Sequence, residues 1–301
     1  MDQRALPQRV VEHIGRVLLG KDREIRLAVA CLLARGHLLI EDLPGMGKTT
    51  LAEALARSFG LGFKRVHFTS DLLPADLTGI GVLQPASGSF RFQPGPLFSQ
   101  VLLADEINRA SPRTQSALLE AMASGRVSVD GVSHELPRPF CVIATQNGQD
   151  QSGTAPLPES QLDRFLMRIS LGFPARAAEL ALLAGQGLGS EALEPLLNPA
   201  DLEELQRRSA AQRAEPALIA YVLDLVQLSR QAGFNGAPLS PRAAQALLAA
   251  ARAWSLLEGR EYVIPADVQA VLAAVCDHRL DGGEPGSSSS RQLQAGVDGL
   301  R

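Results

Sequence analysis

The sequence predicts an α/β protein, a doubly wound parallel sheet between helices, followed by a smaller all-helical domain. In residues 1–173, short apolar runs typical of strands buried on both faces alternate with helical segments. Such alternation indicates a parallel sheet with right-handed crossovers. From residue 174 to 281 only helical patterns remain, which predicts the second domain. Residues 282–301 are rich in Gly and Ser, and we expect a disordered tail there.

The first domain opens with two helical patterns, at residues 5–19 and 22–35, after which the spacing of apolar residues changes. Strands are then expected at residues 37–40, 63–68, 101–104, 140–145 and 165–171, with helices at 48–59 and 112–123. A hairpin is also expected, because Asp130-Gly131 between alternating residues is a strong tight-turn signal.

The second domain is expected to be a bundle of helices, at residues 175–184, 201–209, 215–231, 241–257 and 265–279. Two of these begin with proline, Pro241 after Ser240 and Pro265 after Ile264. Proline is favoured in the first turn of a helix, where its missing N–H leaves no hydrogen bond unmade.

Composition narrows the class of protein. Hydrophobic residues make up 46% of the chain and charged residues 20%, as in a globular protein with a sizeable core. The formal net charge of -3 disfavours non-specific nucleic-acid binding, which usually needs a basic face. Arg35 interrupts the longest apolar stretch, so no membrane span and a cytoplasmic location are expected. The three cysteines lie far apart, and we expect buried thiols rather than metal ligands.

A phosphate-binding loop is expected between the first strand and the helix at residues 48–59. The loop reads Asp42-Leu43-Pro44-Gly45-Met46-Gly47-Lys48-Thr49. In this position, backbone N–H groups and the helix N-terminus can surround a phosphate, Lys48 can reach the β- and γ-phosphates, and the Thr49 hydroxyl can bind Mg²⁺. The general pattern opens with glycine, and Asp42 stands in that place here.

Two carboxylates follow the apolar strand at residues 101–104. They are Asp105 and Glu106, and the carboxyl edge of a parallel sheet is where ligands of open α/β sheets bind. Asp105 is suited to hold Mg²⁺, through water. Glu106 is suited to orient and polarise the attacking water.

Three further residues are candidates for the same chemistry. Asn147, just beyond the strand at residues 140–145, can hydrogen-bond the γ-phosphate and the attacking water. Arg164, in Leu-Asp-Arg-Phe, and Arg242, in Ser-Pro-Arg, can stabilise charge on the transferring phosphoryl group, within one subunit or from a neighbour.

Taken together, these motifs resemble those of AAA+ ATPases, and more narrowly of the MoxR family. The stretches that carry the resemblance cover nearly all of residues 15–280 and are densest at 37–49, 93–98, 105–110, 114–120, 136–147 and 157–165. The family usually has proline after the asparagine at position 147, where this chain has Gly148.

The resemblance implies an AAA+ P-loop core with a helical lid and a role for each candidate residue. Lys48 and Thr49 are similar to the Walker A pair, Asp105 and Glu106 to Walker B, Asn147 to sensor 1, Arg164 to the arginine finger and Arg242 to sensor 2. It also implies a hairpin-like insertion to which residues 89–92 belong. ATP or ADP with Mg²⁺ is the implied ligand, and its expected contacts are Leu19, Gly20, Pro44, Gly45, Met46, Gly47, Lys48, Thr49, Thr50 and Asp105.

The same resemblance implies a ring-forming, commonly hexameric, chaperone-like motor that remodels protein clients, in some relatives with a von Willebrand factor A-type partner during metalloenzyme maturation. A finger supplied to a neighbour also requires a head-to-tail interface, and such interfaces close into rings. Three alternatives stay open at this point: a nucleotide-controlled scaffold with little turnover, a chelatase-type AAA+ subunit, and a nucleic-acid motor.

Overall fold

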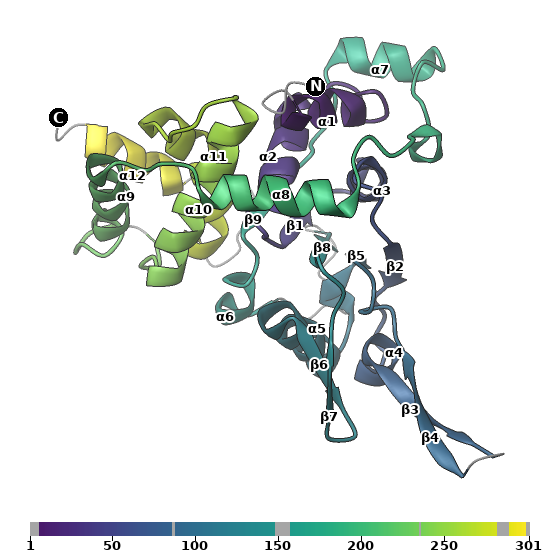
Figure 1. Cartoon of the computed structure of the whole chain (residues 1–301). Coiled ribbons are helices and arrows are strands. Elements are labelled where there is room, and N and C mark those ends of the chain that lie inside the picture. Colours follow the sequence, from purple (N-terminus) through teal and green to yellow (C-terminus); the bar gives the residue numbers. More distant parts are fainter. Residues whose placement is uncertain (1–5, 86–87, 148–156, 235, 282–288, 299–301) are drawn as a thin grey trace.

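The computed structural model describes residues 6–85, 88–147, 157–234, 236–281 and 289–298 (Figure 1). Its centre is a five-stranded sheet with the strand order β2-β5-β8-β1-β9, in which every neighbouring pair is parallel. The strands are β1 (Leu38–Glu41), β2 (Phe63–His67), β5 (Val101–Asp105), β8 (Cys141–Gln146) and β9 (Met167–Ile169). All five expected strands are therefore present, and the predicted parallel sheet is confirmed.

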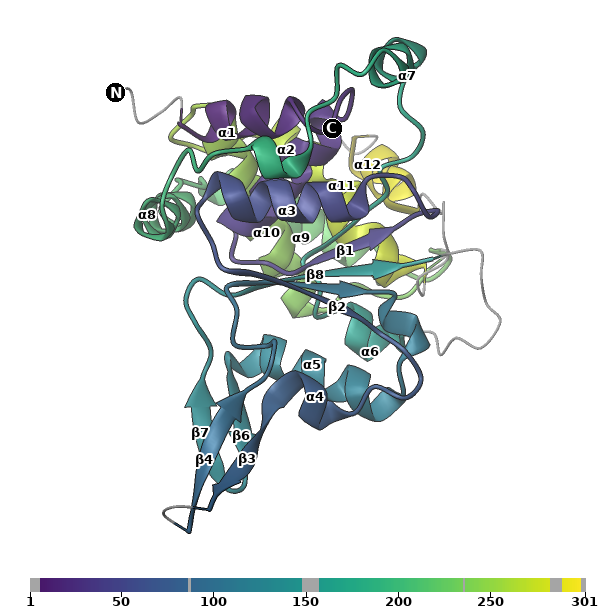
Figure 2. The same cartoon turned by 90° about the vertical axis from the view of Figure 1, so that its right-hand side faces the viewer.

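Helices cover both faces of this sheet (Figure 2). Alternate residues of β1 show how the faces are shared: Leu38 and Ile40 belong to one buried apolar cluster, and Leu39 belongs to the other. The first cluster includes residues of α1 (Leu6–Gly15), α2 (Asp22–Leu33) and α3 (Lys48–Ser58), and the second includes residues of α4 (Pro74–Thr78), α5 (Pro112–Ser124) and α6 (Glu159–Leu162). A 3-10 turn, η1 (Ile107–Arg109), connects β5 to α5.

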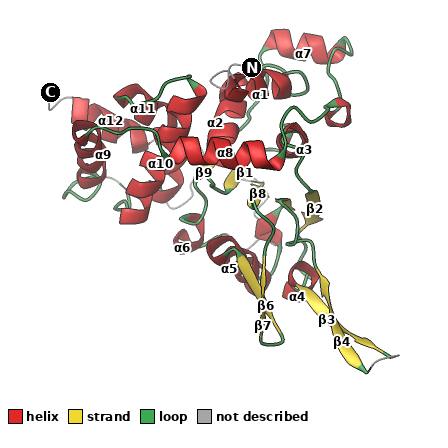
Figure 3. Cartoon of the chain, viewed as in Figure 1, coloured by secondary structure: helices red, strands yellow, loops and turns green. Residues whose placement is uncertain are grey.

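Two hairpins project from the same side of the sheet domain (Figures 1 and 3). One is formed by β3 (Gly79–Gln84) and β4 (Ser89–Pro94), the other by β6 (Arg126–Val129) and β7 (Val132–Glu135). The predicted turn of the second hairpin is confirmed, since Asp130 and Gly131 have φ angles of 51° and 79°. The first hairpin contains residues 89–92, which the family resemblance assigned to a hairpin-like insertion.

The second part of the chain contains only helices among its described elements. They are α7 (Arg176–Leu183), η2 (Ser190–Ala192), α8 (Pro199–Ala210), α9 (Pro216–Leu228), α10 (Pro241–Leu257), α11 (Pro265–Leu280) and α12 (Ser289–Asp298). Helix α10 starts as the sequence predicts: Pro241 is its first residue, and the Ser240 hydroxyl accepts a hydrogen bond from the Ala243 N–H at 3.1 Å.

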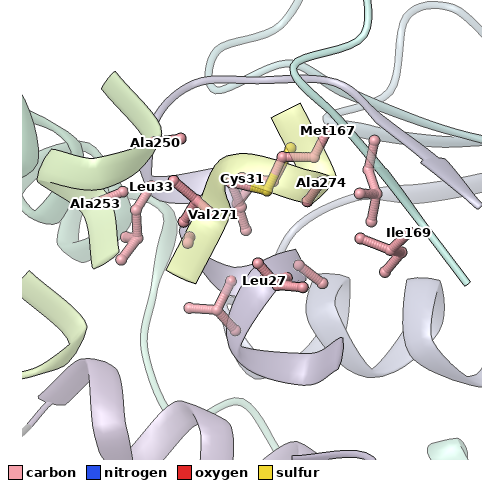
Figure 4. Packing of buried hydrophobic residues seen from close by; sticks show 14 of the residues in the cluster. Leu27, Cys31, Leu33, Met167, Ile169, Ala250, Ala253, Val271 and Ala274 are labelled. Carbon is pink, nitrogen blue, oxygen red and sulfur yellow. The ribbon is translucent and has the colours of Figure 1, made fainter. Parts of the chain in front are cut away.

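This helical lid packs on the sheet domain through a continuous apolar core. Figure 4 shows Leu27 and Cys31 of α2 and Met167 and Ile169 of β9 close to Val271 and Ala274 of α11. Cys31, Cys141 and Cys276 are all free and buried, and burial raises the pKa of the Cys141 and Cys276 thiols to about 12. In the part of the chain that the structure describes, no helix is long and apolar enough to cross a membrane.

The expectation of a disordered tail is wrong for residues 289–298, which form α12. Leu293 and Val297, four residues apart, are buried in the core of the lid, where α12 packs against α9 and α11. Two apolar residues on one helical face therefore anchor this segment, although its Gly/Ser-rich composition predicts disorder.

Candidate functional site

The loop between β1 and α3 has the conformation that phosphate binding requires. Gly45 and Gly47 have φ angles of 81° and 91°, in the left-handed region that residues with a Cβ rarely adopt. A Cβ added at Gly47 would also come within 2.8 Å of Leu18. Helix α3 begins at the next residue, Lys48, so the N-terminus of the helix and its partial positive charge face the space beside the loop.

The Lys48 ammonium group is held by the loop itself. It donates hydrogen bonds to the carbonyl oxygens of Asp42, at 2.6 Å, and Leu43, at 3.2 Å. Partial burial lowers the pKa of Lys48. The negative charges of Asp42, Asp105 and Glu106 act to raise this pKa and offset only part of the effect of burial. The side chain lines the same cavity as Asp105, at the end of β5, and Glu106.

Asp42, which stands where a glycine is usual, ties the loop to the end of β9. Its Oδ2 accepts hydrogen bonds from the backbone N–H of Gly172 at 2.6 Å and from the Ser170 hydroxyl at 3.0 Å. Its Oδ1 accepts from the Leu43 N–H at 2.9 Å. Because Gly172 lies just before the lid, this carboxylate links the phosphate loop to the segment that leads into α7.

Asp105 is the last residue of β5 and is held from both neighbouring strands. Thr145 of β8 donates to its Oδ1 at 2.7 Å, and Arg65 of β2 forms an ion pair with its Oδ2 at 2.5 Å. Burial raises the pKa of Asp105, but the Thr145 hydrogen bond and the Arg65 charge outweigh burial and leave the pKa below its ordinary value. The carboxylate is therefore ionised near neutral pH.

Glu106 adopts a left-handed backbone conformation, with φ 57°, which is uncommon for a residue with a side chain. Its backbone N–H donates to the Thr145 hydroxyl at 2.9 Å, so one threonine fixes both acidic residues. The Glu106 carboxylate forms an ion pair with Arg109 at 2.9 Å and lies 3.5 Å from Nε2 of His67. Strained backbone of this kind is maintained where it aims a side chain for function.

These groups surround a cavity of about 400 Å³ at the carboxyl edge of the sheet. It is lined by Pro44, Gly45, Gly47, Lys48, Thr49, Thr50, Arg65, His67, Asp105, Glu106 and Asn147. The structure thus brings together all the predicted Walker A and Walker B residues and Asn147. Arg65 and His67 were missed, because nothing in the sequence of β2 shows which strand lies beside it. Gly148 lies outside the described residues.

An adjoining cavity of about 700 Å³ shares part of the phosphate loop and is more apolar. It is lined by Val17, Leu18, Leu19, Lys21, Pro44, Gly45, Met46, Gly47, Thr50, Phe173, Pro174, Glu179, Leu182 and Leu183. Gly20, the other predicted contact of this segment, is not among the lining residues and lies against α7, since a Cβ at Gly20 would meet Ala178 at 2.7 Å. The size, the apolar walls and the position next to the loop fit a nucleobase and its ribose. Phe173, on the segment between β9 and α7, is a wall residue that the sequence did not reveal.

The two candidate arginines lie outside both cavities. Arg164 lies in the short connection between α6 and β9, and its Nη1 donates to the carbonyl oxygen of Leu119 at 3.1 Å. Arg242, the second residue of α10, is well exposed and has an Nη1 3.7 Å from Oδ2 of Asp163, the residue before Arg164. The two arginines therefore share one region of the surface, where the start of β9 meets the lid.

Comparison with known proteins agrees with this geometry. The profile of the ATPase family associated with various cellular activities (AAA) matches residues 37–167, and that of the AAA lid domain matches residues 235–301. The chain is 39% identical over 282 residues to the protein named chaperone MoxR1 of Mycobacterium tuberculosis, covering 91% of this chain and 75% of that one. It is 46% identical over 281 residues to the uncharacterized protein YeaC of Bacillus subtilis, covering 93% and 88%.

Similarity to a solved structure extends over almost the whole chain. A crystal structure of a proposed ATPase from Cytophaga hutchinsonii superposes with a TM-score of 0.86 at 32% identity, covering 98% of this chain and 94% of that one.

Proposed function

The chain belongs to the MoxR family of AAA+ ATPases, and from this premise we propose that it works as a ring-forming, chaperone-like motor that remodels protein clients. It is an ATP-hydrolysing P-loop ATPase. We propose a role in hydrolysis for each site residue and protein clients as the target of the motor. One relative, MoxR1, is named a chaperone, which supports the protein-remodelling role. A metalloenzyme client and a von Willebrand factor A-type partner belong to the same proposal.

The observation that carries the proposal is the single cavity that collects Lys48, Thr49, Asp105, Glu106 and Asn147. In our proposal Lys48 and the backbone of the loop bind the β- and γ-phosphates of ATP. Thr49 and the ionised Asp105 would hold Mg²⁺, which when bound neutralises charge on the phosphates. Glu106 orients the attacking water, and Asn147 holds it beside the γ-phosphate.

We propose that Arg164 acts on the nucleotide of a neighbouring subunit. Met167 lies opposite Leu38 in the sheet, so Arg164 is at the amino edge, whereas the phosphate loop follows Glu41 at the carboxyl edge. The length of β1, about 13 Å at roughly 3.3 Å per residue, separates the two edges. An arginine side chain is shorter than that distance, which supports a role between subunits for Arg164.

We propose that Arg242 also acts on the nucleotide of a neighbouring subunit. The expectation from the resemblance was a lid arginine that senses phosphate, and the ion pair with Asp163 brings Arg242 next to Arg164 rather than to its own phosphate loop. Two arginines offered from one surface to an adjacent subunit require a head-to-tail interface, which closes into a ring, and we propose a hexamer.

The two hairpins are the proposed contact surface for clients. Ile80, Leu83 and Phe90 on the first hairpin and Val132 on the second are exposed apolar side chains. Phe92 and His134 stack with ring centroids 3.9 Å apart, so the two hairpins are in contact. Exposed apolar side chains on paired hairpins are suited to grip an extended or partly unfolded polypeptide.

The decisive test is the variant Glu106→Gln, with Glu120→Gln on the exposed face of α5 as a matched control. We expect Glu106→Gln to bind ATP as tightly as the wild type and to lose at least about a hundredfold in steady-state phosphate release, as expected when a water-positioning group is removed. The control should retain normal turnover. Wild-type turnover by Glu106→Gln would overturn the assigned role, and a Glu106→Gln protein that replaced the wild type fully in cells would favour a nucleotide-controlled scaffold instead.

A further inference from the structure

A buried arginine of the lid holds the backbone on both sides of Arg164. The Arg279 side chain, on α11, is only 6% exposed. Its Nε donates to Oδ1 of Asp163 at 2.7 Å, and its Nη2 donates to the carbonyl oxygen of Phe165 at 2.7 Å. One planar guanidinium therefore contacts the residue before Arg164 and the residue after it.

Further contacts from the same guanidinium reinforce this arrangement. Arg279 Nη2 lies 3.3 Å from the carbonyl oxygen of Asp163, and Nη1 lies 3.3 Å from that of Leu166. His278, the preceding residue of α11, places its Nε2 3.2 Å from the same Phe165 oxygen. Several carbonyl groups around Arg164 thus find their hydrogen-bond donors on the lid, although Arg164 itself belongs to the sheet domain.

Asp163 also connects to the second candidate arginine. While its Oδ1 accepts from the buried Arg279, its Oδ2 lies 3.7 Å from Nη1 of the exposed Arg242. The carboxylate thus contacts a buried guanidinium through one oxygen and an exposed guanidinium through the other. It is bonded to Arg164 through the backbone and to Arg242 through charge, so its position affects both arginines.

We infer that Asp163 and Arg279 are positioning residues, which hold Arg164 and Arg242 as a pair in the geometry needed at the neighbouring subunit's nucleotide. The inference rests on the proposed function, in which Arg164 acts between subunits. It adds that the lid of one subunit sets the geometry of catalysis in the next. A displacement of the lid moves α11, and Arg279 transmits that movement to the residues on both sides of Arg164.

If the Asp163–Arg279 ion pair has only a structural role, a different result is expected. If the pair only joins lid to sheet domain, weakening it should impair every site in a ring to the same degree. If it positions the arginines, it should matter only in the subunit that supplies them. Mixed rings separate these two cases, because the supplying and the receiving subunit can then be altered one at a time.

The experiment begins with two parent variants. Glu106→Gln has an inactive site of its own but supplies Arg164, and Arg164→Ala has an intact site but supplies no arginine at that position. Each is expected to be slow alone, and an equimolar mixture should recover phosphate release at the Arg164→Ala sites that adjoin a Glu106→Gln subunit. A mixture with no recovery would contradict the shared site of the proposed function and, with it, the inference.

Given recovery, Asp163→Asn or Arg279→Lys is added to one parent at a time. Asparagine keeps the size of Asp163 and an acceptor for Arg279 but removes the charge, and lysine keeps the charge of Arg279 but cannot make its several directed hydrogen bonds. Placed in the Glu106→Gln subunit, either change should lower the recovered kcat at least about tenfold with little change in KM for ATP, since misplacement of a catalytic group by about 1 Å can cost a hundredfold. Placed in the Arg164→Ala subunit, it should change the recovered kcat less than about twofold, because a site that adjoins the arginines of that subunit already lacks Arg164 and contributes no recovered turnover.

Asp267→Asn is the matched control, because Asp267 also forms an ion pair within the lid, with Arg260, at the opposite end of α11 from Arg279. It should leave recovery unchanged in either subunit. Equal loss from Asp163→Asn in both subunits, or no loss in either, would overturn the inference while the proposed function stood. Asp163→Asn is nearly isosteric, so it can decide the matter even if Arg279→Lys fails to fold.

Discussion

The Thr145 hydroxyl and the Asp105 carboxylate are joined by a hydrogen bond of 2.7 Å, across neighbouring strands of the sheet. The same hydroxyl accepts the backbone N–H of Glu106 at 2.9 Å. A hydroxyl can donate once and accept at the same time, and here both capacities are used on consecutive acidic residues. The end of β8 therefore sets the positions of Asp105, the last residue of β5, and of Glu106, the residue after it.

Replacing Thr145 with valine should lower ATP turnover about 10- to 100-fold, because both acidic residues lose the contact that positions them. Valine has nearly the same shape but leaves the Asp105 oxygen and the Glu106 N–H without this partner, at a cost of about 1–3 kcal/mol in folding stability. Steady-state phosphate release and denaturant unfolding would measure the two effects. Thr145→Ser, which keeps the hydroxyl, should retain most of the activity, and a valine variant with normal kcat would contradict the assignment.

The ATPase activity of the wild type should rise with protein concentration, because an active site completed by Arg164 of a neighbour exists only in the assembled protein. Phosphate release per subunit, measured over a concentration series, would show the rise. Arg164→Ala should remain low at every concentration, by about a thousandfold if the residue acts as an arginine finger. Equal, concentration-independent turnover by both proteins would mean that Arg164 has no such role.

Phe173→Ala should weaken ATP binding and leave the chemical step nearly unaltered. Phe173 is 73% exposed and lines the larger cavity, where its ring can stack on the base. Loss of such a contact, worth about 0.5–1.5 kcal/mol, should raise KM for ATP about 2- to 10-fold at similar kcat. Phe90→Ala is a matched control, since Phe90 is also 73% exposed but lies on a hairpin. A fall in kcat rather than a rise in KM would argue against base stacking.

Acid should destabilise the protein through His37. Its Nδ1 accepts the Val142 N–H at 3.0 Å, so the neutral ring carries its proton on Nε2, which donates to the Met122 carbonyl at 3.2 Å. Burial lowers the pKa of His37 from 6.5 to about 4, against the opposing effect of the Met122 hydrogen bond. The unfolded chain therefore binds a proton at higher pH than the folded chain does.

The His37 contribution should accordingly be complete above pH 6.5 and be lost as pH falls from there to about 4, by up to about 3 kcal/mol. Denaturant unfolding of wild type and His37→Asn between pH 7 and pH 4 would reveal it as a steeper pH dependence in the wild type. Parallel curves for the two proteins would show that His37 contributes nothing to acid sensitivity.

The strands and most helices could be predicted because each carries its own local signal. Leu38 to Ile40 form an unbroken apolar run, and Ser240 with Pro241 marks a helix start. The nucleotide loop was predictable for the same reason, since its function depends on adjacent residues.

Contacts between distant segments had no such signal. Arg65 lies on an edge strand whose polar residues look solvent-facing, and only the strand order brings it to Asp105. Phe173 and Arg279 depend on where the lid rests, which no local pattern encodes. Helix α12 was missed because its buried pair, Leu293 and Val297, follows a Gly/Ser-rich stretch that outweighed it.

The position of β1 in the sheet has a consequence for folding of the protein during its synthesis on the ribosome. Leu38 of β1 pairs with Ile143 on one side and with Met167 on the other, so neither partner exists when β1 emerges. At about 5–20 residues per second, several seconds of translation pass before the strand can be enclosed. During that time its apolar residues are exposed and prone to wrong pairings. Strand β1 therefore gains its second neighbour only after β9, at residues 167–169, has been synthesised.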